Sequence, residues 1–344
     1  MEIGRASAST GRSVRSRPGE RAAGSCWLCR GSDLAILPFR YAFRGRHLYG
    51  VRCCGCGLVF VHPQPAREEI AAMYDEAYFT ECGPERGAHG ALPYLDRAEA
   101  SRPKMLGAAR RLEKLLKPSG GPRGRLLEIG CGPGYLLSAL RELGWSVSGL
   151  EISGFAARRA REEFGLEIAQ GPIAREAFPA SSLDAVLMGD VLEHLADPLP
   201  SLGIVREWLA PGGRLVIALP STMNLLSTKI GLAAHRILGR FRTLRIAPYH
   251  LFEYTPRTAR AMLAASGFDL IDLRQSAVRL GRMPRGGSIL ERGAKLAAQL
   301  LAHATTRSLN RGGDRLLLVA RKPPACPEGE RRDGAAPMRA SSGR

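Results

Sequence analysis

A glycine-rich turn that joins an apolar run to a helix-like segment constrains the fold of this chain more than any other feature. The run Leu126–Ile129 is apolar apart from Glu128 and predicts a short buried strand. Three glycines at alternate positions follow it, namely Gly130, Gly132 and Gly134. They let the backbone turn tightly and leave room for a ligand beside the main chain. A helix is expected to begin at Tyr135, so the order strand, turn, helix predicts an α/β domain.

An acidic residue, Glu151, stands at the end of a second strand-like run, 145–150. In doubly wound nucleotide-binding sheets, a carboxylate at this position accepts hydrogen bonds from ribose hydroxyls. The glycines follow Gly-x-Gly-x-Gly, whereas dinucleotide sites favour Gly-x-Gly-x-x-Gly. Glu128 lies just before the first glycine, where a carboxylate suits an ammonium group better than a phosphate. The pattern favours S-adenosylmethionine over NAD, and its structural alternative is a plain strand-to-helix turn.

These segments resemble the class I S-adenosylmethionine-dependent methyltransferases, whose fold is a Rossmann-like sheet of seven strands. Residues 128–134 are similar to the first motif of that family, and 182–188 are similar to its fourth strand. Residues 190–198 resemble the segment after that strand, and 209–217 resemble the turn into the fifth strand. The resemblance covers about 124 to 322 and implies a doubly wound, mainly parallel seven-stranded sheet with methyltransferase activity.

Strand-like and helix-like segments alternate along this region, which predicts a mainly parallel sheet with helices on both faces. The expected strands are 125–130, 146–151, 183–188, 213–219, 268–275 and 314–321. The expected helices are 135–143, 154–164, 199–209 and 256–266. The resemblance implies that the last two strands form an antiparallel edge pair. Ahead of this domain, helices are expected at 66–78 and 101–117.

The organisation expected for the whole chain places small modules around one large domain. Its parts are a disordered basic tail (1–24), a zinc-ribbon-like module (25–65), a helical connector (66–122), the methyltransferase domain (123–322, with insertions at 221–250 and 279–312) and a second disordered tail (323–344). No apolar run reaches the ~18 residues of a membrane span. The start of the chain lacks the apolar segment of a secretory signal. Together with cysteines that read as paired free thiols, these features predict a cytoplasmic protein.

The cofactor residues are predicted from the rule that ligands of such sheets bind beyond the carboxyl ends of the strands. The methionine part of S-adenosylmethionine is assigned to the first turn, through Glu128, Gly130, Cys131, Gly132 and Gly134. The ribose and adenine are assigned to Glu151, Ile152, Gly171 and Pro172. Met188 and Gly189, after the fourth strand, are expected to lie near the transferred methyl group.

The catalytic candidates are Asp190, His194 and His250, which follow the fourth and fifth strands. Methyl transfer needs an in-line geometry, and a hydroxyl acceptor also needs a base for its proton. Capping or packing roles are the alternatives for both histidines. A second interpretation places Asp190, Glu193 and His194 on one face of a helix, where they would bind a divalent cation. A similar Glu-x-x-Glu-His pattern occurs in ubiquinone-type O-methyltransferases, where it is tied to a metal.

Two cysteine pairs predict a metal site near the start of the chain. Cys26 and Cys29 form one Cys-x-x-Cys pair, and Cys53 and Cys56 form another. Two such pairs complete a tetrahedral zinc site that leaves no open position, so the zinc would be structural. Cys54 is expected to be spare, and the alternative is a set of reduced thiols without metal. Residues 26–79 resemble the zinc-ribbon front end of some methyltransferases that act on sugars and other small metabolites.

The charge pattern bears on the partners of the chain. The formal net charge is +18, which attracts acidic partners, but aromatic residues make up only 6% and offer few stacking platforms for nucleic acid. The insertion 221–250 is basic, with apolar residues at helical spacing from Ile230 to Leu244. A second basic amphipathic stretch is expected at 289–309. Both patterns are typical of helices that lie on an anionic membrane, and a solvated lid is the alternative.

Three functional interpretations follow from the sequence. The leading one is a methyltransferase that acts on a hydroxyl of a small-molecule, saccharide or lipid-linked acceptor. The second is an RNA or protein methyltransferase, which the charge and the zinc-ribbon-like module favour. The third is a protein that binds S-adenosylmethionine without catalysis. The sequence does not define the oligomeric state.

Overall fold

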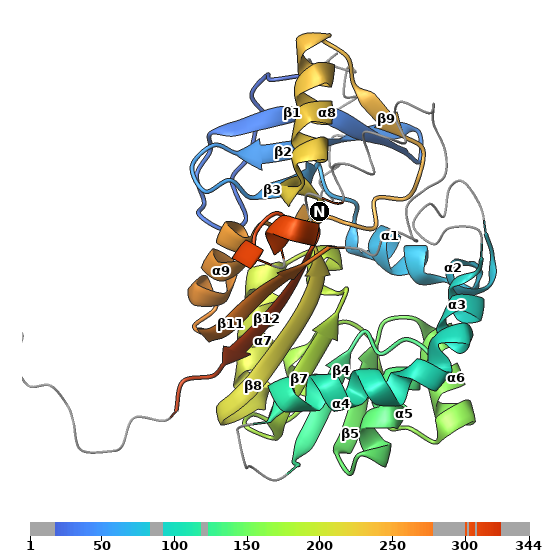
Figure 1. Ribbon diagram of the computed structural model, residues 1–344. Helices are drawn as coiled ribbons and strands as arrows, with labels where there is room; N and C mark the ends of the chain where they lie inside the picture. Colours follow the sequence, from blue (N-terminus) through green and yellow to red (C-terminus); the bar gives the residue numbers. More distant parts are fainter. Residues whose placement is uncertain are drawn as a thin grey trace, which may run out of the picture.

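The computed structural model describes residues 18–82, 92–117, 123–277, 300, 303–306 and 308–324 of the chain. The described residues form two sheets, drawn one above the other in Figure 1. Several predictions lie outside the described residues: most of both tails, the linker 118–122 and nearly all of the insertion 279–312, including the amphipathic stretch expected at 289–309.

The larger sheet has seven strands in the order β11-β12-β8-β7-β4-β5-β6. Its strands are β4 (Arg125–Ile129), β5 (Ser146–Glu151), β6 (Ile168–Gln170), β7 (Leu183–Gly189), β8 (Leu209–Pro220), β11 (Asp269–Ser276) and β12 (Arg315–Arg321). The five strands from β4 to β8 are parallel, and β12 pairs antiparallel with both β8 and β11. The predicted fold class, a doubly wound and mainly parallel sheet, is confirmed.

Alternate residues of the central strands separate the core into two clusters, one on each face of the sheet. One cluster joins Leu126, Leu187 and Val216 to α4 (Met105–Leu116), α5 (Tyr135–Glu142) and α6 (Gly154–Phe164). The other joins the neighbouring strand residues to α7 (Pro198–Trp208) and α9 (Pro256–Ala265). Figure 1 shows α4 crossing the front of the sheet. This two-sided burial explains why the strands read as nearly continuous apolar runs.

The smaller sheet combines two distant parts of the chain. Its strands are β1 (Leu34–Phe43), β2 (Arg46–Cys53), β3 (Val59–His62), β9 (Arg242–Leu244) and β10 (Phe252–Glu253), in the order β10-β3-β2-β1-β9. Both edge strands, β9 and β10, follow the fifth parallel strand of the other sheet. α8 (Leu226–Ile237) precedes β9, and Leu232 of α8 packs on the apolar face of β1 to β3. The zinc-ribbon-like module and the first insertion therefore build one sheet.

Two helix predictions before the large sheet are wrong in detail, because each helix is divided. The region 66–78 contains α1 (Arg67–Ala71), a 3-10 turn, and α2 (Glu76–Thr80), which begins where the Asp75 side chain accepts from the Tyr78 N–H. The region 101–117 contains the end of α3 (Tyr94–Ser101), a 3-10 turn and α4. Pro103 lies in that second turn and lacks the N–H that a continuous helix needs.

The helical spacing expected from Ile230 to Leu244 is also wrong beyond Ile237. α8 ends there, and Gly239 takes a left-handed conformation with φ of 63°. Phe241 packs edge-on against Tyr49 of β2, and Leu244 lies in β9. A glycine in the left-handed region commonly ends a helix, so Gly239 is the local cause of the change.

Candidate functional site

The glycine turn at the carboxyl end of β4 is held in a shape that requires glycine. Gly130, Gly132 and Gly134 have φ values of 68°, 53° and 83°, all in the left-handed region. A Cβ on Gly130 would lie 2.5 Å from Cγ2 of Val191, and one on Gly134 would lie 2.7 Å from Cδ1 of Leu166. The turn is therefore packed on its inner side and leads directly into α5.

Two buried carboxylates flank this turn. Glu151, at the end of β5, accepts from the Gly132 N–H at 2.8 Å and from the Ser153 N–H at 2.9 Å. Oε2 of Glu128 has no hydrogen-bond partner among the described residues. Burial and the nearby Glu151 raise the pKa of Glu128 to about 8. A cationic group entering this space would stabilise the ionised form of Glu128.

The other residues predicted to bind the cofactor differ in what they expose. Gly171 donates its N–H to the carbonyl of Glu151 at 2.9 Å, so the turn after β6 adjoins the end of β5. Ile152 follows Glu151 in the sequence and Pro172 follows Gly171, and both residues are at least partly exposed. The side chains of Cys131 and Met188 are buried in the two core clusters. Gly189, which follows Met188 at the end of β7, is exposed.

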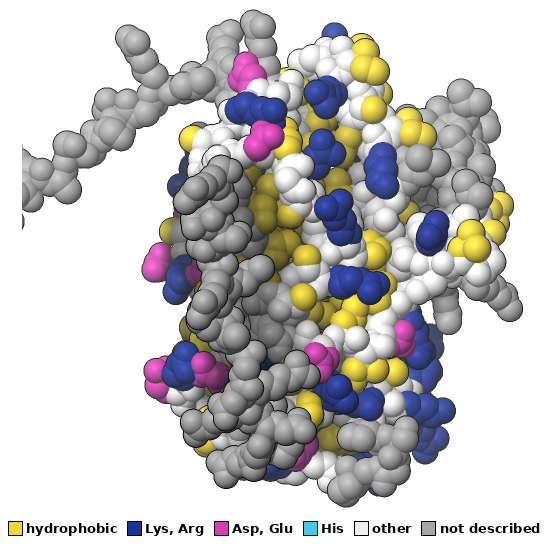
Figure 2. Space-filling model, turned by 90° about the vertical axis from the view of Figure 1, so that its left-hand side faces the viewer, with side chains coloured by type: hydrophobic (Ala, Val, Ile, Leu, Met, Phe, Trp, Pro, Cys, Tyr) yellow, Lys and Arg dark blue, Asp and Glu magenta, His cyan; other side chains and the backbone are white. Residues whose placement is uncertain are grey.

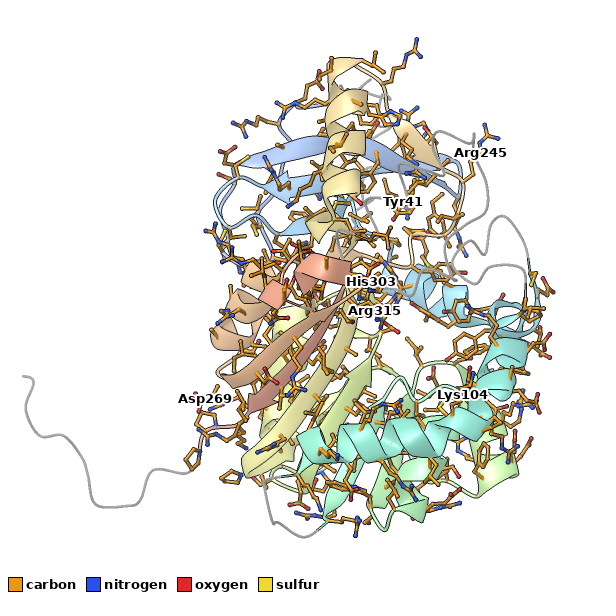
Figure 3. The ribbon with its side chains drawn as sticks, in the orientation of Figure 1. Tyr41, Lys104, Arg245, Asp269, His303 and Arg315 are labelled. Atoms are coloured by element: carbon orange, nitrogen blue, oxygen red, sulfur yellow. The ribbon has the colours of Figure 1, made fainter. Side chains whose placement is uncertain are left out.

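The segment after β7 departs from the predicted helix. Asp190 has a φ of 55°, and only Leu192–His194 form a single 3-10 turn. Asp190, Glu193 and His194 therefore do not share a helical face, and that interpretation is wrong. Asp190 is paired with Arg315 of β12 at 2.6 Å, and Figure 3 places Arg315 between the two sheets. Glu193 is instead 1% exposed, and the described residues give neither of its carboxylate oxygens a hydrogen bond.

The residue that groups with Glu193 and His194 is His250, whereas the sequence interpretation groups Asp190 with them. The rings of His194 and His250 lie 5.0 Å apart between centroids. Glu193, His194 and His250 offer ligand atoms that all lie within 4.8 Å of one another. The two predicted catalytic histidines are thus brought together, although one follows the fourth parallel strand of the chain and the other follows the fifth.

Hydrogen bonds fix the orientation of His194. Its Nδ1 lies 2.7 Å from the Tyr249 carbonyl oxygen and 3.0 Å from the Tyr74 hydroxyl. Because a carbonyl oxygen only accepts, Nδ1 carries the proton and the neutral ring keeps a lone pair on Nε2. Nε2 lies 3.6 Å from Oε1 of Glu193. Nε2 is therefore the atom of this ring that can bind a proton or a cation.

The electrostatics around His250 favour its positively charged form. Burial raises the pKa of Glu193 to about 8, with a further contribution from Asp190. Burial alone would lower the pKa of His250, but Glu253, Glu193 and Asp190 outweigh it and raise the pKa. Nδ1 of His250 lies 3.7 Å from Oε1 of Glu253. This cluster can therefore receive a proton or a divalent cation.

Sequence reasoning missed a set of aromatic side chains beside this site, which we call the aromatic wall: Tyr74, Tyr78, Phe79, Tyr94 and Tyr249. The ring of Tyr78 lies 5.2 Å from those of both Tyr74 and Tyr249. The Tyr94 hydroxyl lies 3.4 Å from where a Cβ on Gly132 would be. Burial and the Glu151 carboxylate raise the pKa of Tyr94 to about 12. The available signal was the aromatic run 74–79, whose position in space the sequence does not give.

The four predicted zinc ligands form one cluster. The Sγ atoms of Cys26, Cys29, Cys53 and Cys56 all lie within 4.8 Å of one another. Arg30 and Gly57 directly follow the two cysteine pairs and have φ values of 62° and 88°. This left-handed backbone completes the tight turn, or knuckle, that each pair forms. Cys54 lies outside the cluster and accepts from Arg21. This donor set matches tetrahedral zinc sites.

A family model described as a methyltransferase domain matches residues 101–273, half of the chain. This chain is a class I S-adenosylmethionine-dependent methyltransferase. The match covers β4 to β8 with the glycine turn, Glu151 and the two histidines, and it begins after the cysteine cluster. Membership of this family supports S-adenosylmethionine as the methyl donor.

The methyltransferase is also similar to curated proteins named ubiquinone biosynthesis O-methyltransferase. It is 35% identical to one from Caulobacter sp. (strain K31), over 42% of this chain and 60% of that protein. It is 33% identical to one from Dinoroseobacter shibae, over 43% of this chain and 61% of that protein. The matches thus span less than two thirds of each relative.

Among solved structures, the methyltransferase is similar to a SAM-dependent methyltransferase from Archaeoglobus fulgidus. The identity is 20% and the TM-score is 0.46, over 67% of this chain and 98% of that one. A putative methyltransferase from Bacillus halodurans is 16% identical with a TM-score of 0.44, over 63% of this chain and 98% of that one.

Proposed function

We propose that this enzyme methylates a hydroxyl group of a small-molecule, saccharide or lipid-linked acceptor. The observation that carries the proposal is the pair His194 and His250 beside the buried Glu193, at the carboxyl ends of the parallel strands. A hydroxyl must lose its proton to attack the sulfonium methyl group, and this cluster can take up that proton. The relatives named O-methyltransferases support the same acceptor chemistry.

In this proposal the first turn binds the methionine part of the cofactor. The ammonium group lies against Glu128, whose pKa is raised by burial and by the nearby Glu151. The backbone from Gly130 through Cys131 to Gly134 surrounds the rest of the amino acid. Glu151 accepts the ribose hydroxyls while it keeps the Gly132 N–H in place.

The remaining cofactor contacts lie at the ends of the neighbouring strands. Ile152, Gly171 and Pro172 border the adenine, next to the hydrogen bond between Gly171 and the Glu151 carbonyl. The exposed backbone at Gly189, after the buried Met188, faces the transferred methyl group. These assignments place the sulfonium between the first turn and the histidine pair.

His250 is proposed as the base. Its side chain is 31% exposed against 17% for His194, so it is the more accessible ring to an acceptor. Glu253 lies beside its Nδ1 and stabilises the imidazolium that forms when the hydroxyl proton arrives. His194 is held by the Tyr249 carbonyl and orients the pair. Asp190 with Arg315 borders the acceptor side of the site.

The same groups also fit a divalent cation. Glu193, His194 and His250 would bind it. The fit is supported by the buried carboxylate of Glu193, whose oxygens have no hydrogen bond among the described residues. The Nδ1–H of His194 donates to a backbone carbonyl, which is the usual outer contact of a metal-binding histidine. A bound cation would make the acceptor hydroxyl more acidic.

The four-cysteine cluster is proposed to bind structural zinc. Cys26, Cys29, Cys53 and Cys56 leave no position open for substrate, so the metal stabilises the fold. Metal analysis of the purified chain tests this assignment, and one zinc per chain is expected. A folded chain without metal would contradict it.

Peripheral contact with an anionic membrane is proposed for α8 and the residues after it. Ile230, Ile237 and Leu238 are 61%, 85% and 65% exposed. The exposed cations beside them are Lys229, Arg236, Arg240, Arg242 and Arg245. In Figure 2, lysine and arginine side chains alternate with hydrophobic ones over the upper part of the molecule. None of the described helices is long and apolar enough to cross a membrane.

Product analysis with S-adenosylmethionine labelled in its methyl group tests the acceptor chemistry. A panel of catechols, glycans and lipid-linked hydroxyl compounds is screened for release of S-adenosylhomocysteine, and the label is then located by NMR. A methyl ether is the expected product, made by the wild type and lost in His250→Gln. A label found only on nitrogen or carbon would contradict the proposal.

A further inference from the structure

The short segment Tyr249–Glu253, which we call the bridging segment, is bonded to the smaller sheet and to the 3-10 turn after β7. On one side, Phe252 and Glu253 pair with β3, and the Val61 N–H donates to the Leu251 carbonyl at 2.8 Å. On the other side, the Leu251 N–H donates to the Glu193 carbonyl at 2.8 Å. The bridging segment also contains His250 and the Tyr249 carbonyl that orients His194.

A side chain from the first cysteine knuckle packs on the bridging segment. Trp27 stands between Cys26 and Cys29, and its ring meets that of Phe252 edge-on, with centroids 6.1 Å apart and planes at 88°. Phe252 is 1% exposed and also contacts the rings of Phe60 and Tyr254. The knuckle therefore touches the bridging segment, which contains His250, although the knuckle lies outside the matched methyltransferase region.

We infer that Trp27 is a positioning residue of the active site, through which the four-cysteine knuckle fixes the bridging segment and so the histidine pair. This inference rests on the proposed function of His194 and His250. It assigns the zinc-ribbon-like module to the acceptor side of the enzyme, where it forms part of the catalytic framework. The cofactor turn is fixed separately, by the hydrogen bonds of Glu151.

The chain of contacts explains why Trp27 would act on the histidines and leave the cofactor site unchanged. Trp27 contacts Phe252, and the backbone next to Phe252 is bonded to Glu193, the residue before His194. Loss of the indole would loosen β10 at the edge of its sheet, where it pairs only with β3 among the described strands. A two-residue edge strand has few backbone hydrogen bonds of its own, so side-chain packing decides its order.

Hydrogen–deuterium exchange of the full-length, zinc-loaded chain tests the inference. Trp27→Ala is compared with the wild type, with Trp27→Phe as the conservative variant, and with Phe43→Ala as a matched control. Phe43 is also a half-buried aromatic residue of the smaller sheet, but it lies at the far end of β1 and makes no aromatic contact with the bridging segment among the described residues. Zinc content and affinity for S-adenosylhomocysteine are measured on the same samples.

The expected result is local. Trp27→Ala keeps one zinc per chain and binds S-adenosylhomocysteine within about twofold of the wild type, while amides 249–254 exchange about tenfold faster or more. Trp27→Phe restores most of the protection, and Phe43→Ala leaves it unchanged. Unchanged exchange in Trp27→Ala would overturn the inference, and so would an equal increase throughout the chain.

Two further outcomes separate this inference from the claims around it. Loss of zinc by Trp27→Ala would contradict it, because the residue would then act on the metal site. Failure of the wild type to form a methyl ether would contradict the proposed function, and the exchange result would still show whether the knuckle holds the bridging segment.

Discussion

The carboxylate of Glu151 accepts a hydrogen bond from the backbone N–H of Gly132, with 2.8 Å between the nitrogen and Oε2. This bond ties the end of β5 to the middle of the glycine turn after β4. The same side chain accepts from the Ser153 N–H, at the start of α6. One buried acid therefore sets the positions of two segments that we propose contact the cofactor, so its removal should affect both.

Gly134→Ala is expected to destabilise the enzyme. The left-handed conformation costs an L residue about 1–2 kcal/mol, and the new Cβ would lie 2.7 Å from Leu166 and 3.0 Å from Ala160. Gly107→Ala is the matched control, because its Cβ would meet only the end of Arg111 at 3.6 Å inside α4. A gain of about 0.5–1 kcal/mol is expected there. Urea unfolding compares the two, and equal effects would contradict the account.

Glu128→Gln is expected to stabilise the free enzyme at high pH. The pKa of Glu128 is raised from 4.5 to about 8 by burial and by Glu151. The folded state therefore prefers the protonated acid and loses stability as pH rises from 4.5 through 8. The glutamine variant stays neutral, so its advantage in thermal unfolding grows over that window and vanishes at pH 4. A variant that is less stable at pH 8 would contradict this assignment.

The same variant is expected to weaken cofactor binding, because it cannot pair with an ammonium group. Binding of S-adenosylhomocysteine to the wild type at pH 7 should also release protons, since the cation favours the ionised form of Glu128. Titration in buffers of different ionisation enthalpy measures this release. Stronger binding by Glu128→Gln, or equal proton release from both proteins, would contradict the role.

Glu253→Gln is expected to shift the pH dependence of methyl transfer. Glu253 raises the pKa of His250, and a base must be neutral to accept a proton, so the rate falls as pH drops below that pKa. The glutamine lowers the pKa of His250 and moves the acidic fall in rate to lower pH. His250→Gln should lower kcat by roughly 10²–10⁴-fold above the pKa of His250, and the difference should shrink below it. An unchanged pH profile in Glu253→Gln would contradict the proposed effect of Glu253 on His250.

Ile230→Ser with Ile237→Ser is expected to weaken binding to vesicles that contain anionic lipid. Both side chains are largely exposed, so their loss removes apolar contact with the lipid and leaves the folded core intact. Flotation with phosphatidylglycerol vesicles measures binding, and Ile271→Ser, at an exposed position in β11, is the control. Wild-type protein that stays unbound at low salt would exclude the membrane contact.

The central sheet was predictable because its signals are local. The apolar strands, the glycines at 130, 132 and 134 and the acid at 151 each specify their own segment. Most bounds of this sheet and its helices lie within one residue of the predicted ones, but β8 begins at Leu209, before the predicted 213, and β6 had no predicted range. The antiparallel pairing of the last two strands came from the resemblance. The grouping of the four cysteines followed from their spacing in two pairs.

The acceptor side was less predictable because it depends on contacts between distant segments. β9 pairs with β1, and β10 pairs with β3, although all the parallel strands of the larger sheet lie between these partners in the sequence. No short sequence pattern predicts such a pairing. Asp190 itself takes a left-handed backbone conformation, which is unusual for a residue other than glycine. No sequence pattern indicates this conformation, so the helix expected there was wrong. Tyr74 meets His194 and Tyr249 only after folding, which is why the aromatic wall was missed.

Isothermal titration with S-adenosylhomocysteine, on the wild type and on Glu151→Ala, tests the account most directly. The account predicts micromolar binding by the wild type and a loss of at least about 1.4 kcal/mol, or tenfold, in the variant. Ser153→Ala, which removes the α6 cap but leaves the carboxylate in place, should bind nearly as well as the wild type. Equal affinity of Glu151→Ala and the wild type would contradict the proposed cofactor site.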